Sequence, residues 1–306
     1  MPPAKQKLRK KLEQVEGVFD IAEILGLQTN KNYTQKYYKA NQLAYSLFHT
    51  RTGIIHMGIS KDGIYKEDDL LEAARIVEGF ISKVKAKNIL ELATGRGGTS
   101  VWLAKQHPGI TFDGIDLSEG QLVYAKKQAT KLNNYHPLKG DYHDLSHYSD
   151  GSIDIVFVIE ALCYSEDRPK VMTEVKRVLR KGGVFIVIDA YNGKLRSTMT
   201  KDELLACRLT ELGMAVKEFR NYNSLLEDAK KCGFVVVSSQ EMSQYILPTL
   251  RKFEKVSQKF FSHPKSAKLI TRIFSKEVTY NAISALLMPD LVEQGLATYH
   301  TTVLKK

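Results

Sequence analysis

The sequence has little cysteine, with three residues among 306. Cys163, Cys207 and Cys232 stand too far apart for a disulfide framework or a cysteine-based zinc site. An odd number of thiols is typical of a reducing compartment, so we expect a cytoplasmic protein without a metal site. The chain also lacks an apolar run of the roughly 20 residues that a membrane span needs. No apolar segment follows the basic N-terminus, so we expect no secretory signal.

Acidic residues are scarce in two segments. Residues 1–11 hold five cations and no acid, and residues 251–276 hold eight cations against Glu254 alone. The net charge of +11 lies almost wholly in these segments. They are either a solvated tail and a solvated helix face, or surfaces that attract phosphates or an anionic membrane. Because no aromatic residues alternate with the cations as in RNA-binding surfaces, we expect no nucleic-acid partner, and homo-oligomer formation stays open.

Strands and helices alternate in the middle of the chain. The predicted strands cover residues 88–92, 111–116, 136–139, 153–159 and 184–189, and two more follow at 234–238 and 297–304. Helices fill the intervals, and we expect the helix over residues 169–179 to be stopped by Gly182 and Gly183. This alternation predicts a parallel sheet covered by helices.

The pattern breaks on both sides of this alternation, which predicts four parts. The chain divides into a helical N-terminal extension or cap (1–65), a core (66–243), a helical lid (244–292) and a final core strand (293–306). The lid is too long for a simple loop between two strands. We expect the extension and the lid to cover the carboxyl edge of the sheet and to form an apolar pocket.

A glycine-rich turn follows the first strand. Residues 91–98 read ELATGRGG, and such glycines allow a sharp turn, close approach to a ligand and free amides at a helix start. Asp116 ends the next strand, 19 residues after Gly97, where an acid accepts both ribose hydroxyls of an adenosine. The glycines alone are compatible with a structural turn, but the pair of features favours a nucleoside-type cofactor.

The neighbouring residues separate the candidate cofactors. NAD needs a third glycine where Ser100 stands, and a carboxylate at Glu91 repels its pyrophosphate. Glu91 suits the ammonium and sulfonium of S-adenosylmethionine instead, whereas the absence of a GK[ST] motif excludes a Walker A site. After the third strand, Asp141 is placed to accept from the adenine amine and Tyr142 to flank the ring; a surface turn is the alternative.

These segments together resemble the motifs of class I S-adenosylmethionine-dependent methyltransferases. The matching segments are NILELATGRGGTSVWLA, FDGIDLSEGQLVYAKK, GDYHDLSHYSDGSIDIVFVIEALCYSED and RVLRKGGVFIVIDAY. The resemblance implies a Rossmann-like α/β fold with a seven-stranded, mostly parallel sheet and an antiparallel last strand. It also implies conversion of S-adenosyl-L-methionine to S-adenosyl-L-homocysteine. The predicted cofactor-binding residues are Glu91, Ala93, Thr94, Gly95, Gly97, Asp116, Leu117, Gln121, Asp141, Tyr142 and Ile159. Ala93 and Thr94 depart from the glycine and cysteine that are usual in the first motif.

A narrower resemblance concerns the acceptor. The segment IEALCYSED looks like that of sterol C-methyltransferases and is similar to that of prenyl-chain and tocopherol-type enzymes. MSQYILPTLRKF resembles the lid entrance of this group, and the tyrosine-rich stretch 33–48 lies where these enzymes carry an aromatic substrate-binding segment. The resemblance implies a small, apolar acceptor, such as a terpenoid or a sterol-like lipid, with transfer to carbon.

Methyl transfer from a sulfonium needs positioning and exclusion of water more than it needs a nucleophile or a metal. An alkene acceptor leaves a carbocation, which aromatic faces and a carboxylate stabilise. Glu160 is the first catalytic candidate, since the carbon-methylating relatives use a carboxylate there, unless it only orients the cofactor. His143 is the second, unless it is a surface histidine. The predicted substrate-binding residues are Tyr37, Tyr38, Tyr45, His56, Glu160 and Tyr164, with packing as the alternative for the tyrosines.

Three functions are therefore open. The first is transfer to carbon of an apolar small molecule. The second is O- or N-methylation of a natural product or small metabolite. The third is a nucleic-acid or protein binder that keeps a vestigial cofactor fold and uses its local positive charge.

Overall fold

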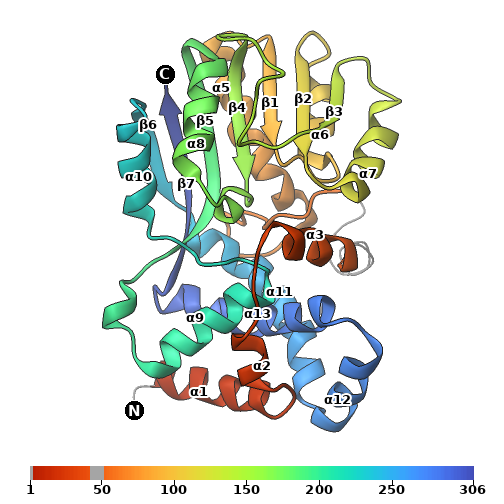
Figure 1. Ribbon diagram of the computed structural model, residues 1–306, viewed down its shortest axis with the longest axis vertical. Helices are drawn as coiled ribbons and strands as arrows, with labels where there is room; N and C mark the ends of the chain where they lie inside the picture. The colour runs from red at the N-terminus through yellow and green to blue at the C-terminus, as the bar shows by residue number, and fades with distance from the viewer. Residues whose placement is uncertain (1–2, 42–51) are drawn as a thin grey trace.

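The computed structural model describes residues 3–41 and 52–306, which form two layers. A sheet covered by helices lies at the top of Figure 1, and a layer of helices lies below it. The carboxyl ends of the parallel strands point toward the helical layer, and helix α3 (Lys31–Ala40) lies between the two. The fold therefore places the ligand-binding edge of the sheet at the junction of the layers.

The sheet has seven strands in the order β3-β2-β1-β4-β5-β7-β6. Their bounds are β1 (Asn88–Leu92), β2 (Thr111–Asp116), β3 (Tyr135–Lys139), β4 (Ile153–Ile159), β5 (Leu179–Asn192), β6 (Val235–Glu241) and β7 (Ala297–Lys305). Strands β1 to β5 pair in parallel, and β7 runs antiparallel to both β5 and β6. The predicted Rossmann-like sheet with an antiparallel last strand is thus confirmed.

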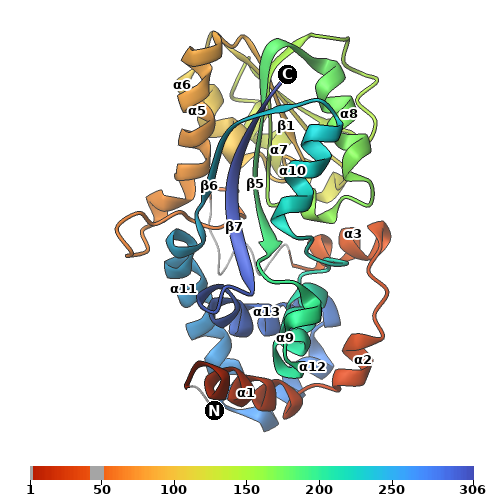
Figure 2. The same cartoon turned by 90° about the vertical axis from the view of Figure 1, so that its left-hand side faces the viewer.

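Helices cover both faces of this sheet, as the view in Figure 2 shows. One face carries α5 (Glu72–Val84), α6 (Gly98–Gln106) and α7 (Glu119–Ala129), and the other carries α8 (Arg168–Val178) and α10 (Tyr222–Lys231). A short 3-10 helix, η2 (Glu67–Leu71), leads into α5. Helix α5 is amphipathic and buries Ala73, Ala74, Val77 and Ile81, which are spaced to share one face. Strand β4 is apolar at almost every position because both of its faces are covered.

The predicted stop of α8 at Gly182 and Gly183 is wrong. The helix ends at Val178, and Leu179 is already extended and begins β5. Pairing with β4 jumps from Leu179 opposite Ile153 to Val184 opposite Ile155. The two glycines therefore lie inside a bulge of the strand, where Gly182 takes a φ of +79° that favours glycine.

The lower layer consists of helices from three parts of the chain. They are α1 (Pro3–Glu16), α2 (Ile21–Leu25), α9 (Lys201–Gly213), α11 (Ser243–Phe261), α12 (Pro264–Ile273) and α13 (Lys276–Glu293). Leu8, Leu209 and Ile283 belong to their shared apolar core. The buried Lys11 pairs with Glu254 and Asp290, so that α1 is tied to both α11 and α13.

This arrangement differs in two ways from the expected cap and lid. Helices α1 and α2 pack under α9 and α13, on the side away from the sheet, and of the helices described in residues 3–41 only α3 reaches its carboxyl edge. Helix α9, which falls within the predicted core range 66–243, joins the helical layer because its apolar face contacts α1 and α13. The four-part division itself stays a prediction.

Two further 3-10 helices complete the fold, η3 (Leu162–Tyr164) after β4 and η4 (Arg196–Thr198) after β5. Among residues 3–41 and 52–306, no helix combines the length and apolar character that crossing a membrane requires.

Candidate active site

A cavity of about 1110 Å³ lies between the sheet and the helical layer. On the sheet side, it is lined by Glu91, Asp116, Ile159 and Asp189, which lie at or near the carboxyl ends of four strands. On the other side, it is lined by α3, α11, α12 and α13. Open α/β sheets bind ligands at this edge, so the cavity is the candidate active site.

The turn between β1 and α6 forms one wall of the cavity. Ala93, Gly95 and Gly97 all have left-handed φ values, of +55°, +56° and +79°. A Cβ on Gly97 would lie 2.5 Å from the Tyr135 hydroxyl, so this position needs glycine for space as well as for conformation. Gly98 opens α6 and lines the cavity, which puts the positive end of the helix dipole at its wall.

Two buried carboxylates face the cavity beside this turn. Glu91 Oε2 accepts hydrogen bonds from Thr94 Oγ1 (2.5 Å) and Ser100 Oγ (2.6 Å), and burial raises the pKa of Glu91 to about 7. Asp116 accepts from the amides of Gly95 (2.8 Å) and Ser118 (2.7 Å), and burial raises its pKa as well. Neither carboxylate has a cationic partner within the part of the chain that the structure describes.

This wall fits S-adenosylmethionine. Unpaired, buried negative charge suits a ligand with ammonium and sulfonium groups, and it repels a pyrophosphate. Gln121 also lines the cavity, and its buried Nε2 has no hydrogen-bond partner among the described residues. A buried donor of this kind is costly unless a ligand or a water accepts from it.

The segment after β3 is held by a network at the opposite end of this wall. His143 Nδ1 lies 2.7 Å from Asp141 Oδ1, and His143 Nε2 lies 2.9 Å from Ser165 Oγ. Lys31 of α3 donates to Asp141 Oδ2 at 2.7 Å. Burial alone would raise the pKa of Asp141, but the hydrogen bonds from Lys31 and His143 outweigh it and lower that pKa to about 2. Tyr142 is buried beside them and donates to the Ala161 carbonyl at 3.2 Å.

Glu160 follows β4 with a left-handed φ of +50°, a costly conformation for a residue with a side chain. Its Oε1 accepts from the Met57 amide at 2.7 Å and from the Tyr299 hydroxyl at 2.8 Å. Burial raises the pKa of Glu160 to about 7, with a smaller contribution from Asp189. Asp189 accepts from the Cys163 amide at 2.9 Å, and burial raises its pKa to about 6. The site thus holds two neighbouring carboxyl groups that titrate near neutral pH.

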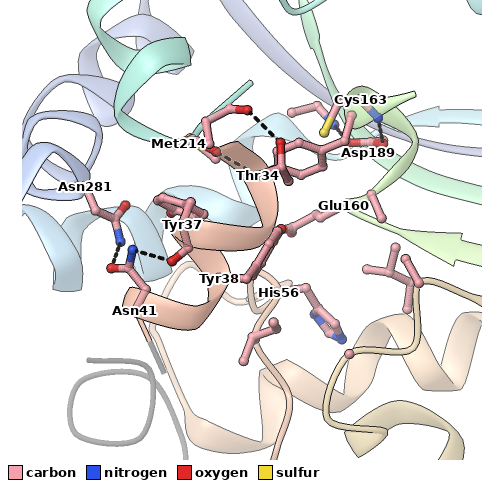
Figure 3. A pocket seen from close by; sticks show the side chains of 18 of the residues that line it. Thr34, Tyr37, Tyr38, Asn41, His56, Glu160, Cys163, Asp189, Met214 and Asn281 are labelled. Carbon is pink, nitrogen blue, oxygen red and sulfur yellow. Dashed lines mark hydrogen bonds between the residues drawn. The ribbon is translucent and has the colours of Figure 1, made fainter. Parts of the chain in front are cut away.

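Aromatic side chains from α3 and η3 line the cavity together with Glu160. Figure 3 shows Tyr37 and Tyr38 of α3 in the same pocket as Glu160. The rings of Tyr37 and Tyr38 are edge-on at 5.3 Å between centroids, and Tyr38 meets Tyr164 in the same manner at 5.8 Å. The Tyr164 hydroxyl donates to the Met214 carbonyl at 2.9 Å. Tyr45 lies outside the described residues.

His56 lines the same cavity as a neutral imidazole. Burial lowers its pKa to about 4, so the ring carries no charge at neutral pH. Its Nδ1 lies 3.0 Å from the Met57 carbonyl, which only accepts, so Nδ1 carries the proton. Nε2, at 3.3 Å from Thr99 Oγ1, is then the acceptor.

The helices of the lower layer complete the cavity with mostly apolar side chains. Among these are Leu250, Phe253, Phe260, Ile270, Phe274 and Met288. The cavity therefore has a polar end at the glycine-rich turn and an apolar end between α3 and helices α11 to α13.

The structure brings almost all of the predicted site residues together. Ten of the eleven predicted cofactor residues line the cavity, and Gly97 instead packs against Tyr135 to set the turn. The catalytic candidates Glu160 and His143 and the substrate candidates Tyr37, Tyr38, His56 and Tyr164 line it as well. Their roles stay predictions, since a place in the wall does not define a contact.

Three residues at this site were missed from the sequence. Asp189 ends the strand predicted at 184–189, and the carboxyl-edge rule would have selected it. Tyr299 is the third residue of the last strand, and an antiparallel strand starts at the edge where its parallel neighbours end. Met57 contributes a backbone amide, for which a sequence carries no signal. Within residues 3–41 and 52–306, no His, Cys, Asp and Glu side chains gather into a group of three that could hold a metal ion.

Comparisons with known proteins identify the family of the chain. A family model described as a methyltransferase domain matches residues 83–274. Methyltransferase GfsG of Streptomyces halstedii is 29% identical over 220 residues, which cover 70% of this chain and 76% of that protein. Sterol methyltransferase-like 1 of Botryococcus braunii is 25% identical over 190 residues, covering 61% of this chain and 46% of that protein.

A solved structure shows the same fold. The cyclopropane synthase MmaA2 from Mycobacterium tuberculosis superposes with a TM-score of 0.73 at 15% identity, and the match covers 91% of this chain and 99% of that chain. Since the family model spans more than half of the sequence and the cavity suits its cofactor, the chain belongs to the methyltransferase domain family, as a class I S-adenosylmethionine-dependent methyltransferase that acts on small molecules.

Proposed function

We propose that this methyltransferase transfers the methyl group to a carbon atom of an apolar, terpenoid or sterol-like acceptor. The observation that carries the proposal is Glu160, a buried carboxylate that lines the cavity and has no cationic partner among the described residues. A carboxylate in such surroundings is costly to ionise unless a positive charge develops beside it. Transfer to an alkene carbon produces such a charge, whereas transfer to a neutral oxygen calls for a base.

We assign the cofactor to the polar end of the cavity. Glu91 would face the ammonium of S-adenosylmethionine, Asp116 would accept from the ribose hydroxyls, and Asp141 and Tyr142 would meet the adenine. Asp141 already accepts three hydrogen bonds, two from His143 and one from Lys31, and a carboxylate has room for about four. When bound, the cofactor supplies a methyl group that its sulfonium has already activated.

The apolar end supports a neutral acceptor or an apolar part of one. Helices α11, α12 and α13 contribute no cation to the described lining of the cavity. The lining cations are Lys31, Lys170, Lys217 and Arg220, which come from α3, α8 and the segment before α10. An acceptor held by its diphosphate would need cations beside its anchoring group, so a long neutral hydrocarbon fits this end better.

Within this proposal, the residues of the chain perform three tasks. The aromatic group Tyr37, Tyr38 and Tyr164 presents ring faces and edges to the acceptor and excludes water. As the new carbon–carbon bond forms and the carbon–sulfur bond breaks, positive charge appears on the acceptor and Glu160 stabilises it. Both hydrogen bonds that Glu160 accepts, from the Met57 amide and the Tyr299 hydroxyl, are to Oε1. Oε2 is therefore the oxygen that accepts the proton which the acceptor loses when the alkene is restored.

A second candidate is methylation of oxygen or nitrogen, which one observation favours. His143 is paired with Asp141 through Nδ1, and this arrangement fixes the orientation of the ring. Nε2 contacts Ser165, so His143 serves as a base only if an acceptor hydroxyl replaces that serine. A vestigial fold that only binds nucleic acid or protein has no such support, because ten of the eleven predicted cofactor residues line one cavity.

The test is product analysis with a panel of acceptors. The protein is incubated with S-adenosylmethionine carrying a ¹³C-labelled methyl group and with a prenyl alcohol, a prenyl diphosphate, a sterol, a phenol and an amine. The proposal predicts a labelled methyl bonded to carbon with the prenyl alcohol or the sterol, as NMR of the product would show. Labelled methyl found only on oxygen or nitrogen would contradict it.

A further inference from the structure

The lower layer carries an exposed apolar patch on α12. Leu269 and Ile273 are 59% and 69% exposed, and Ile270 and Phe274 are 37% and 51% exposed. Val256 of α11 is 47% exposed. We call these five residues the α12 patch. Contiguous apolar side chains on a protein surface mark a site of interaction rather than chance exposure.

Cations flank the α12 patch. At 3.6 residues per turn, Lys265, Lys268 and Arg272 form one stripe along α12, Leu269 and Ile273 form the next, and the buried Ala267 lies on the far side. Lys255 and Lys259 add two charges from α11. None of these five cations has an ion pair among the residues that the structure describes, whereas Arg251 pairs with Glu254 and Glu293, and Lys276 pairs with Glu23.

The patch is continuous with the cavity. Val256, Ile270 and Phe274 line the cavity as well as being exposed, while Leu269 and Ile273 do not line it. The apolar end of the cavity therefore reaches the surface between α11 and the end of α12, beside the two outward-facing side chains. The side chains of Ile270 and Phe274 thus provide an apolar connection between the patch and the cavity.

We propose that the α12 patch docks on an anionic membrane surface and that the acceptor enters the cavity from the bilayer at this point. Leu269 and Ile273 insert among the acyl chains, and the five cations meet the lipid phosphates. The arrangement is that of a helix lying in the membrane interface, with an apolar face bordered by Lys and Arg. A membrane fits better than a protein partner because the two most exposed residues of the patch, Leu269 and Ile273, are aliphatic, whereas Tyr and Trp are the apolar anchors of protein interfaces.

Membrane docking follows from the apolar residues and cations of the α12 patch alone, whereas the entry of a lipid acceptor rests on the function proposed above. Binding is therefore measured first, without any acceptor, by sedimentation with phosphatidylcholine vesicles that contain or lack phosphatidylserine. The wild-type chain should bind the anionic vesicles at least tenfold more tightly than the neutral ones, and added salt should weaken this binding.

Two variants and a control locate the contact. Leu269→Glu/Ile273→Glu and Lys265→Glu/Lys268→Glu should each reduce binding to the anionic vesicles by roughly tenfold or more. Leu195→Glu changes an apolar residue of similar exposure (64%) outside the patch and should leave binding unchanged. Unchanged affinity for S-adenosylmethionine shows that each variant is folded. Wild-type binding to neither kind of vesicle, or equal binding by all four proteins, would overturn the docking.

A second readout separates this inference from the proposed function. For an acceptor identified with the panel, Leu269→Glu/Ile273→Glu should methylate the detergent-dispersed compound at the wild-type rate and the vesicle-embedded compound more slowly. Equal rates of the wild type and this variant on the embedded compound would overturn entry through the patch. Methylation of oxygen by a protein that still binds anionic vesicles would reject transfer to carbon and leave the docking standing.

Discussion

The two ends of the cavity are built in different ways. The polar end comes from three short segments, 91–99, 116–121 and 141–143, each at the end of a parallel strand. The apolar end comes from α3, residues 53–57 and α11 to α13, which lie far apart in the chain. The proposed cofactor-binding end is therefore formed by residues that are close in the sequence, whereas the proposed acceptor-binding end depends on how distant helices pack. Sequence motifs can predict the cofactor-binding end but not the acceptor-binding end.

The two ends are nevertheless coupled through the N-terminal part of the chain. A Cβ on Gly98 would lie 2.6 Å from the Ile54 amide, so residues 53–54 cross directly over the start of α6. The Met57 amide holds Glu160, and Lys31 of α3 holds Asp141. Variants that change one end alone are thus the sharpest way to test whether the two ends perform separate tasks.

The largest effect on cofactor affinity is expected at the polar end. Asp116→Ala removes the proposed acceptor for the ribose hydroxyls and the acceptor for the Gly95 amide, so affinity for S-adenosylmethionine should fall by about 1–3 kcal/mol, or roughly five- to 150-fold. Titration calorimetry measures this loss. Asp113→Ala changes the same strand at a carboxylate that faces His136 and should leave the affinity unchanged. Equal losses in both variants would mean that the effect arises from the strand and not from the site.

A somewhat smaller effect is expected at the apolar end. Tyr38→Ala removes the ring between Tyr37 and Tyr164, so kcat/KM for the identified acceptor should fall roughly tenfold, with unchanged cofactor affinity. Tyr38→Phe keeps the ring and should retain most of the activity. A loss of cofactor affinity in Tyr38→Ala would break the distinction between the two ends.

The pH dependence of cofactor binding tests Glu91. Burial raises the pKa of Glu91 to about 7, and a cationic ligand favours the ionised form, so binding below that pKa must displace a proton. Affinity should therefore increase with pH, by roughly tenfold between pH 6 and pH 8 as the ionised fraction grows. Glu91→Gln should bind more weakly and lose this dependence. A wild-type affinity that falls as the pH rises through 7 would contradict the assignment.

The smallest effect is expected for two alanines with a left-handed backbone conformation, one in the glycine-rich turn and one after α9. Ala93 (φ +55°) lies in the glycine-rich turn and Ala215 (φ +58°) lines the cavity after α9. Glycine relieves the backbone strain at both positions, but it also increases the conformational entropy of the unfolded chain, which offsets part of the gain. Each Ala→Gly change should therefore stabilise the fold by roughly 0.5–1 kcal/mol. Urea unfolding measures the change, and destabilisation at both positions would contradict the strain.

Most of the sheet and the polar end could be predicted because their signals are local. Strands β1, β2 and β4 have the predicted bounds, since each is a short segment that contains β-favouring apolar residues and ends at a turn. The start of β5 was missed because Val178 and Leu179 are compatible with either helix or strand until pairing with β4 decides. The placement of α9 was also missed, because an amphipathic helix does not encode which partner covers its apolar face.

The catalytic centre was predictable only in part. Glu160 could be found because it directly follows a buried strand. Its two hydrogen-bond partners could not, because the Met57 amide and the Tyr299 hydroxyl reach it across 103 and 139 residues of sequence. Such contacts depend on tertiary packing, which positions a side chain without leaving a motif.

The most direct test of transfer to carbon is Glu160→Gln, measured by single-turnover kinetics beside cofactor affinity. The substitution keeps the shape and removes the charge, and a preorganised charge of this kind is worth about 3–4 kcal/mol. We predict that the methyl-transfer rate falls about 10²–10³-fold while affinity for S-adenosylmethionine stays within about twofold. An unchanged rate, or a rate that falls only in step with cofactor affinity, would contradict stabilisation of a carbocation by Glu160.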